Sequence, residues 1–172
     1  MIAGPRPDPA LPDTPPLPAV IGHLAGVLAA AQFPTSERAR LRRQDPAQPP
    51  GLHFLRFALR HLPPGWERQP RAWMTLVVGL ALMGRTAHRP DQPAGRALAQ
   101  AGYSERHLER LLAAEGTTLY TLLLRAARFL AARQAGCNWV DFARLVLTGR
   151  RTKKRQAARL AIARAFYANQ EG

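Results

Sequence analysis

The sequence predicts an all-α protein, a compact helical bundle of about eight helices arranged in two lobes. Apolar residues recur at helical spacing in one segment after another; Leu108, Leu111 and Leu112, for example, fall at i, i+3 and i+4. Prolines and glycines separate these segments at lengths typical of helices. No segment shows the alternation of apolar and polar residues that predicts a half-buried strand. A chain of 172 residues is long enough to bury one good core.

Residues 1–17 are expected to be a disordered, proline-rich lead to an all-α domain of residues 18–172. The first 18 residues contain seven prolines and no apolar core, which excludes a helix and the apolar segment of a signal peptide. The longest apolar run, from Trp73 to Met83, is too short to cross a bilayer. The sequence therefore predicts a cytoplasmic protein without membrane contact.

The N-terminal lobe is expected to span about residues 18–86 and to begin with two helices. The first covers about residues 17–33, and its Gly22 and Gly26 would let another helix approach closely. After a proline, Ser36 is the expected cap of a short arginine-rich helix.

Two further helices complete this lobe. One spans about residues 52–62, and the residues expected to face the core are Leu52, Phe54, Leu55 and Ala58. The other spans about residues 71–84, with Pro70 in its first turn. Because the second is apolar nearly all round, it should be central and buried.

The C-terminal lobe is expected to span about residues 94–170, after a loop of residues 85–93. Its helices should cover about residues 94–101, 105–114, 118–134, 139–147 and 152–169. The expected N-caps are Ser104, either Thr117 or Thr118, and Asn138. In the last helix Ala158, Ile162 and Phe166 should face inward, and Arg151, Arg155 and Arg159 outward.

The charge balance predicts a polyanionic partner. Lysine and arginine number 25 against 11 acids, a formal net charge of +14, and only Lys153 and Lys154 are lysines. Residues 1–34 hold one base and two acids, whereas residues 35–62 hold six bases and two acids. The basic surface therefore belongs to the folded part. A field of this sign attracts polyanions, and guanidinium groups bind phosphate in a two-pronged geometry and stack on bases.

Three basic clusters are candidate nucleic-acid contacts, each with an alternative explanation. The cluster that follows Ser36 could be a solvated helix face, the second could pair with Glu105, Glu109 and Glu115, and the third could bind an acidic protein surface. In that order, the candidates are Arg38, Arg40, Arg42 and Arg43; Arg106, Arg110, Arg125 and Arg128; and Arg150, Arg151, Lys153, Lys154, Arg155 and Arg159. None is interleaved with aromatic residues in sequence, so the expected mode is neutralisation of the phosphate backbone.

Catalytic, cofactor and metal sites are not expected. The five histidines show no metal-binding spacing, and the single Cys137 allows neither a zinc framework nor an intrachain disulfide. No glycine-rich phosphate-binding loop is present. Glu105 and Glu109 lie one turn apart beside arginines, as on an ordinary solvated helix. The sequence therefore predicts a non-catalytic protein.

An ordered set of short elements runs along nearly the whole chain. They are Leu41-Arg42-Arg43, the apolar helix Arg71–Gly84, the element Gly95–Ala99, the segment from Ser104 to Leu112, Trp139 after a polar cap, and the closing Phe166-Tyr167. In this order they resemble the CasB family, the small subunit of the type I-E CRISPR surveillance complex Cascade. The last helix departs from the family pattern, because it lacks the further tryptophan and the more acidic ending, and so does His107, which stands where an arginine or an aromatic residue is common.

The resemblance implies an all-α, non-catalytic subunit present in two copies in Cascade. Its expected partners are the CasC-type backbone subunits, the large CasA-type subunit, a second copy of itself, CRISPR RNA and target DNA. Its arginines would hold the displaced DNA strand and the heteroduplex backbone, and so stabilise the R-loop in antiviral defence. Arg42 and Arg43 are the first candidates for these contacts.

Two other functions stay open at this stage. Residues 99–130 resemble the first half of an AraC-type helix-turn-helix regulator, in which the 105–114 helix would enter the major groove. The second helix-turn-helix of that family is absent, and Arg38 to Arg43 would have no role. The third possibility is a structural adaptor whose arginines touch no nucleic acid.

Overall fold

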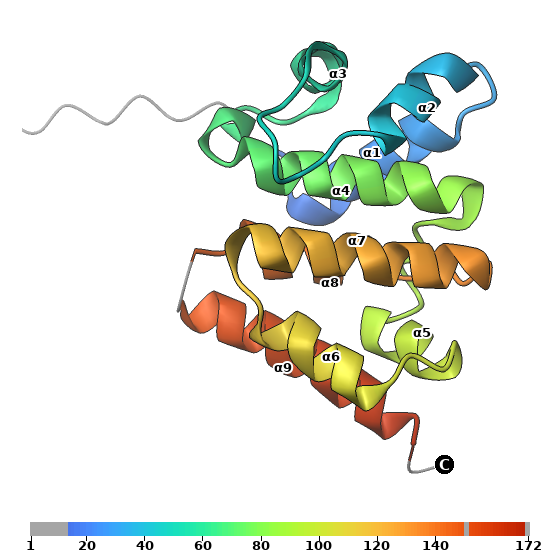
Figure 1. The fold of residues 1–172 in the computed structure, drawn as a ribbon, viewed down its shortest axis with the longest axis vertical. Coiled ribbons are helices and arrows are strands. Elements are labelled where there is room, and N and C mark those ends of the chain that lie inside the picture. Colours follow the sequence, from blue (N-terminus) through green and yellow to red (C-terminus); the bar gives the residue numbers. More distant parts are fainter. Residues whose placement is uncertain (1–13, 150–151, 171–172) are drawn as a thin grey trace, which may run out of the picture.

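The computed structural model describes residues 14–149 and 152–170, and these residues form an all-α structure (Figure 1). The prediction of the fold class is confirmed. Residues 1–13 of the expected disordered lead lie outside the described part. Within it the α-helices are α1 (Leu17–Ala29), α2 (Thr35–Arg42), α3 (Leu52–His61), α4 (Pro70–Met83), α5 (Ala94–Gln100), α6 (Glu105–Ala113), α7 (Gly116–Ala132), α8 (Trp139–Leu147) and α9 (Lys153–Ala168), with short 3-10 helices η1 (Trp66–Arg68) and η2 (Gly84–Thr86).

Helices α4 and α7 run side by side through the middle of the molecule (Figure 1). Helix α4 is buried almost all round, as its apolar sequence predicts, and Pro70 occupies its first position. Helices α2 and α3 lie on the far side of α4 from α7, whereas α5, α6 and α9 lie beyond α7 (Figure 1). Helix α1 passes behind α4 in this view and packs on both α4 and α8. One apolar cluster runs through both halves of the chain. The division into two lobes at residues 86–94 stays a prediction.

The expected bounds of the first two helices are wrong in detail. Helix α1 ends at Ala29, because Ala30 adopts an extended conformation, and the following turn lets α2 pack on α4. Helix α2 begins at Thr35 without a side-chain cap, so Ser36 lies inside it. A side chain of α2 also closes the end of α1. The Arg38 guanidinium donates hydrogen bonds to the Leu28 oxygen at 3.0 Å and to the Ala30 oxygen at 3.3 Å.

Two apolar expectations for the N-terminal helices are also wrong. Gly22 and Gly26 face solvent, and a Cβ on either would meet no atom within 4 Å, so they permit no close helix contact. Leu52 is 81% exposed. The buried stripe of α3 is centred on Phe54, Phe57 and Ala58, and Leu52 lies two residues before this stripe, on the other side of the helix.

The C-terminal helices follow the expected pattern more closely. The Ser104 hydroxyl accepts from the His107 amide, and the Asn138 side chain accepts from the Val140 amide, so both predicted caps are confirmed. Neither Thr117 nor Thr118 is a cap, because both lie inside α7, which begins at Gly116 after the N-cap position Glu115. Close packing of α5 on α9 depends on Gly95, where a Cβ would lie 2.0 Å from the Ile162 oxygen.

The segments before α5 and before α8 are joined by His88 and Cys137. These residues form an isolated parallel bridge, and the His88 Nδ1 atom accepts a hydrogen bond from the Trp139 amide at 3.2 Å. An acceptor nitrogen cannot carry a proton, and burial lowers the pKa of His88. The contact therefore needs the neutral imidazole.

We expect the protein to lose stability on mild acidification, in part through His88. Its folded pKa lies below the unfolded value of ~6.5, so the unfolded chain binds the proton more readily, and stability present above pH ~6.5 falls as the pH is lowered. In His88→Asn the amide oxygen can replace Nδ1 as acceptor without titrating. Urea unfolding at pH 7.5 and 5.0 should show a smaller difference for this variant than for the wild type; an equal difference would contradict the assignment.

Candidate nucleic-acid interface

The arginines of α2 divide into one structural residue and three exposed ones. Arg38 is half-buried, donates to the two carbonyls at the end of α1, and lies 5.6 Å from the centre of the Phe33 ring. Arg40, Arg42 and Arg43 are exposed. The sequence pattern places Arg38 and Arg42 on one face, but the structure binds the first to α1 and leaves the second in solvent.

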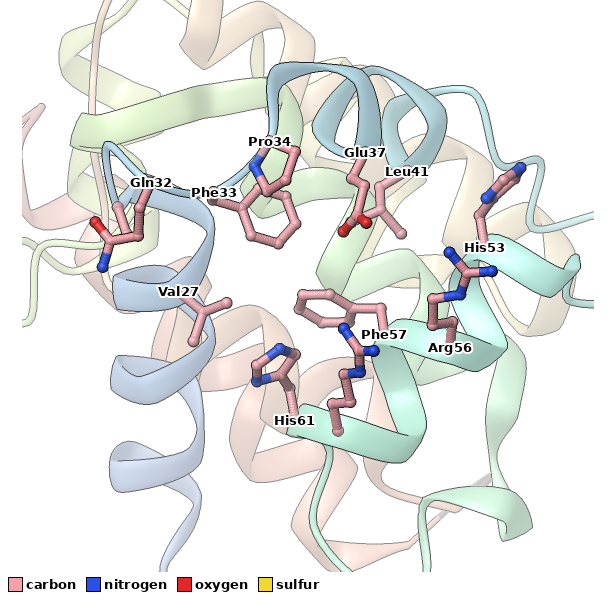
Figure 2. Close-up of a pocket in the computed structure, with 12 residues that line it drawn as sticks. Val27, Gln32, Phe33, Pro34, Glu37, Leu41, His53, Arg56, Phe57 and His61 are labelled. Atoms are coloured by element: carbon pink, nitrogen blue, oxygen red, sulfur yellow. The ribbon is translucent and has the colours of Figure 1, made fainter.

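Beside α2 lies a pocket of about 300 Å³ between α1, α2 and α3 (Figure 2). Phe33 and Phe57 form its apolar part, with ring centres 6.1 Å apart. Arg56 and Arg60 of α3 line its rim. Both are exposed, and they add positive charge to the α2 end of the molecule. Sequence analysis did not single them out, because an arginine on an amphipathic helix carries no signal until the neighbouring helix is known.

The second cluster forms a groove between α6 and α7. Arg110 of α6 and Arg125 of α7 both line it, together with Tyr103, His107 and Phe129, and its volume is about 190 Å³. We call it the α6–α7 groove. Arg106 and Arg128 are exposed on the same two helices but do not line it. The structure therefore brings together two of the predicted arginines, Arg110 and Arg125. The aromatic rings beside them were not predicted from the sequence.

The acids of α6 do not line the groove. Glu105 accepts a hydrogen bond from the Tyr167 hydroxyl of α9 at 2.5 Å, and both Glu105 and Glu109 contribute to raising the pKa of that phenol. Among residues 14–149 and 152–170, the ion pair is Arg89 with Asp91. The structure therefore shows no ion pair between Arg106 or Arg110 and the neighbouring glutamates among the described residues.

The third cluster is only partly accessible. Lys153 and Lys154 are exposed at the start of α9, whose cap is the Thr152 hydroxyl. The prediction that Arg155 faces outward is wrong, because it is 4% exposed and donates to the Ala114 oxygen at 2.6 Å. Arg159 is half-buried rather than fully outward. Arg150 and Arg151 lie outside the described residues.

The α2 cluster and the α6–α7 groove do not form one patch. Helix α2 lies beyond α4 and α6 lies beyond α7, so the central pair of helices separates them (Figure 1). Any polyanion that contacts both would have to pass across or around this pair. The structure thus offers these two basic surfaces on opposite sides of α4.

The described residues hold neither a cluster of potential metal ligands nor an exposed thiol. No group of three or more potential metal ligands gathers within them. Cys137 is fully buried, and burial raises the pKa of its thiol. No helix in this part of the chain is long and apolar enough to span a bilayer. What the surface does offer is guanidinium groups without carboxylate partners, an arrangement suited to phosphate.

A family model described as CRISPR-associated protein Cse2 matches residues 37–167. The chain belongs to the Cse2 family. Cse2 and CasB name the same small subunit of type I-E systems, so the resemblance read from the sequence is confirmed. The match counts against the AraC-type alternative, because it extends from within α2 to within α9 and is not confined to residues 99–130.

Among solved structures, this Cse2 chain is similar to one in the crystal structure of E. coli Cascade bound to a PAM-containing double-stranded DNA target. The two chains are 24% identical, with a TM-score of 0.62, and the alignment covers 85% of this chain and 95% of the other. The likeness shows a shared fold. No curated protein sequence matches the chain.

Proposed function

We propose that this protein is the non-catalytic small subunit of a type I-E Cascade complex and stabilises the R-loop by phosphate contacts from its arginines. Membership of the Cse2 family supports the place in Cascade. The main support for a nucleic-acid role is that acidic and basic side chains of α6 lie in different places. Glu105 accepts a hydrogen bond from Tyr167 of α9, whereas Arg110 lines the groove with Arg125 of α7. Arginines in this state are free to take phosphate as their partner.

The energetics of the R-loop explain why such contacts matter. Replacing a DNA duplex with an RNA–DNA heteroduplex is nearly balanced, so protein contacts to the strands tip the equilibrium. Each phosphate that an arginine neutralises releases condensed counterions, which favours binding and makes it depend on salt. The exposed groups proposed for this role are Arg40, Arg42, Arg43, Arg106, Arg110, Arg125, Arg128, Lys153 and Lys154, with Arg56 and Arg60 added from the pocket rim.

The structural residues are left out of this set. Arg38 closes the end of α1 and Arg155 holds α9 to the end of α6, so neither can reach a strand without giving up a contact within the fold. The proposed partners are the large CasA-type subunit, the CasC-type backbone subunits, a second copy of the chain, CRISPR RNA and target DNA. A cytoplasmic location stays a prediction.

Replacing Arg42 and Arg43 with alanine should weaken R-loop binding by the assembled complex and lower its salt dependence. Two lost phosphate contacts reduce the slope of log K against log salt by roughly one to two units. Complex assembly should survive, because both side chains are exposed. The measurement is R-loop affinity between 50 and 200 mM salt, in the range over which such slopes are resolved.

The matched control is Arg89→Ala. Arg89 is also exposed, but it already pairs with Asp91 at 3.3 Å, so its loss should leave the slope unchanged. If the Arg42→Ala, Arg43→Ala double variant keeps the wild-type slope, these residues are not in the interface. If the Arg110→Ala, Arg125→Ala double variant also keeps the wild-type slope, the phosphate role of the α6–α7 groove is contradicted as well, and a structural adaptor is favoured.

A further inference from the structure

The α6–α7 groove contains three aromatic rings from three places in the chain. Tyr103 comes from the turn before α6, His107 from α6 and Phe129 from α7. The Tyr103 ring centre lies 5.1 Å from that of Phe129 and 5.7 Å from that of His107. The groove of about 190 Å³ holds a group much larger than a water molecule, whose share of liquid volume is ~30 Å³.

The rings are held in place by their own contacts. The Ser104 hydroxyl lies 2.8 Å from His107 Nδ1, which fixes the imidazole at the start of α6. The Arg133 guanidinium lies 3.6 Å from the centre of the Phe129 ring and donates to the Phe129 oxygen, so it covers one side of that ring. A preorganised aromatic surface loses little side-chain entropy when a flat ligand stacks on it.

The charge around the rings selects an anionic ligand. Arg110 and Arg125 line the groove, and each favours the ionised form of the Tyr103 phenol against the effect of burial, which raises the pKa of that group. No carboxylate lines the groove, and Glu105 of α6 is hydrogen-bonded to Tyr167 of α9. A ligand that combines a flat ring with a nearby negative charge matches this arrangement in both respects.

We propose that the α6–α7 groove binds one unpaired base of the displaced DNA strand, stacked on the Tyr103 ring, while Arg110 and Arg125 hold the flanking phosphates. The Phe129 ring lies at 69° to the Tyr103 ring, so it packs edge-on against Tyr103 and does not stack on the same base. This inference rests on the proposed function and narrows it to a single-stranded ligand. A base inside a duplex has both faces covered by its neighbours, so only an unpaired base can present a face to the rings. Stacking tolerates any sequence, because every base has a π-face.

The aromatic platform changes the expected mode of binding. Backbone neutralisation alone would treat single and double strands alike apart from their charge density. An aromatic platform adds a preference for single strands, because the base must leave its stack to reach it. The protein would thereby favour the open R-loop over the closed duplex at one defined position of the displaced strand.

Abasic sites test the proposal in the assembled complex. Single abasic residues are placed in turn along the displaced strand of an R-loop target, and affinity is measured for the wild type and for Tyr103→Leu. In the wild type one position, or two neighbouring ones, should weaken binding about 5- to 10-fold. In Tyr103→Leu the same abasic residue should cause no further loss, because the stacking partner is already gone. Tyr103→Phe retains the ring and should behave as the wild type.

Three results would overturn the proposal. The first is a wild-type complex in which no abasic position weakens binding. The second is a position-specific loss that persists in full in Tyr103→Leu. The third is a loss that occurs only when the abasic residue is in CRISPR RNA, which would exclude the displaced strand as the ligand.

Photochemical cross-linking keeps the proposal testable if Tyr103→Leu does not assemble. Halogenated uracil is placed in the displaced strand at successive positions, and the wild-type complex is irradiated. Cross-links at Tyr103, His107 or Phe129 support the groove, and cross-links confined to other residues contradict it. The salt slope of Arg110→Ala, Arg125→Ala separates the two proposals: an unchanged slope contradicts the phosphate role of this surface, whereas a reduced slope without any abasic effect contradicts only the base site.

Discussion

Gly95→Ala should destabilise the protein by about 3 kcal/mol or more, at the upper end of what overpacking costs. The added Cβ would lie 2.0 Å from the Ile162 oxygen and 2.8 Å from the Phe166 amide nitrogen, and both are backbone atoms of α9. A side chain could rotate away, but a helix backbone cannot, so α5 and α9 would have to separate. Urea unfolding followed by circular dichroism at 222 nm measures the loss.

Gly22→Ala and Gly26→Ala are the matched controls. A Cβ at either position meets nothing within 4 Å, and both glycines lie inside α1. Here the lower conformational entropy of alanine in the unfolded chain should dominate, so each variant should gain about 0.5–1 kcal/mol. A Gly95→Ala variant as stable as these controls would show that α5 and α9 are not in close backbone contact.

Arg155→Ala should destabilise the protein by about 2–3 kcal/mol, the range for losing a buried hydrogen bond to a charged group. The Arg155 guanidinium donates to the Ala114 oxygen at 2.6 Å and so holds α9 to the junction of α6 and α7. Truncation removes this donor and leaves unfilled space beside Ala114. Arg155→Lys should restore little, since an ammonium lacks the planar set of donors.

Lys153→Ala and Lys154→Ala are the controls for Arg155. Both lysines are exposed in the same turn of α9, and surface changes of this kind usually stay within ±0.5 kcal/mol. Thermal and urea unfolding of all the variants give the comparison. Wild-type stability in Arg155→Ala would contradict the burial of this side chain. Any loss of R-loop affinity in that variant should leave the salt slope intact, because no phosphate contact is removed.

The parts of the fold that the sequence predicted correctly are those that depend on nearby residues. The apolar surface of α4 and the caps Ser104 and Asn138 are set by side chains within a few positions of the groups they contact. The sequence predicts the end of α1 beyond Ala29, where the helix in fact ends. One carbonyl near this end, that of Leu28, accepts a hydrogen bond from Arg38 of the next helix. Helical periodicity carries no information about such a donor.

The candidate site was predicted less completely for the same reason. Periodicity placed Arg155 on the outer face of α9, but its partner Ala114 lies 41 residues away in sequence, beyond the reach of a local pattern. The aromatic groove was missed because Tyr103 and Phe129 belong to different segments and meet only when α6 packs on α7. Composition still identified the arginine excess and its polyanionic partner, since net charge does not depend on the fold.

The enclosed thiol of Cys137 has a practical consequence for studies of motion in this protein. It is the single cysteine of the chain, and it is fully buried. Its backbone is hydrogen-bonded to the backbone of Ala87 and Arg89. A thiol-directed reagent can therefore react only after the segment before α8 has come away from the segment before α5. The rate of thiol labelling therefore reports how often these two segments separate. Comparing this rate with the rate of global unfolding distinguishes local opening from loss of the whole fold.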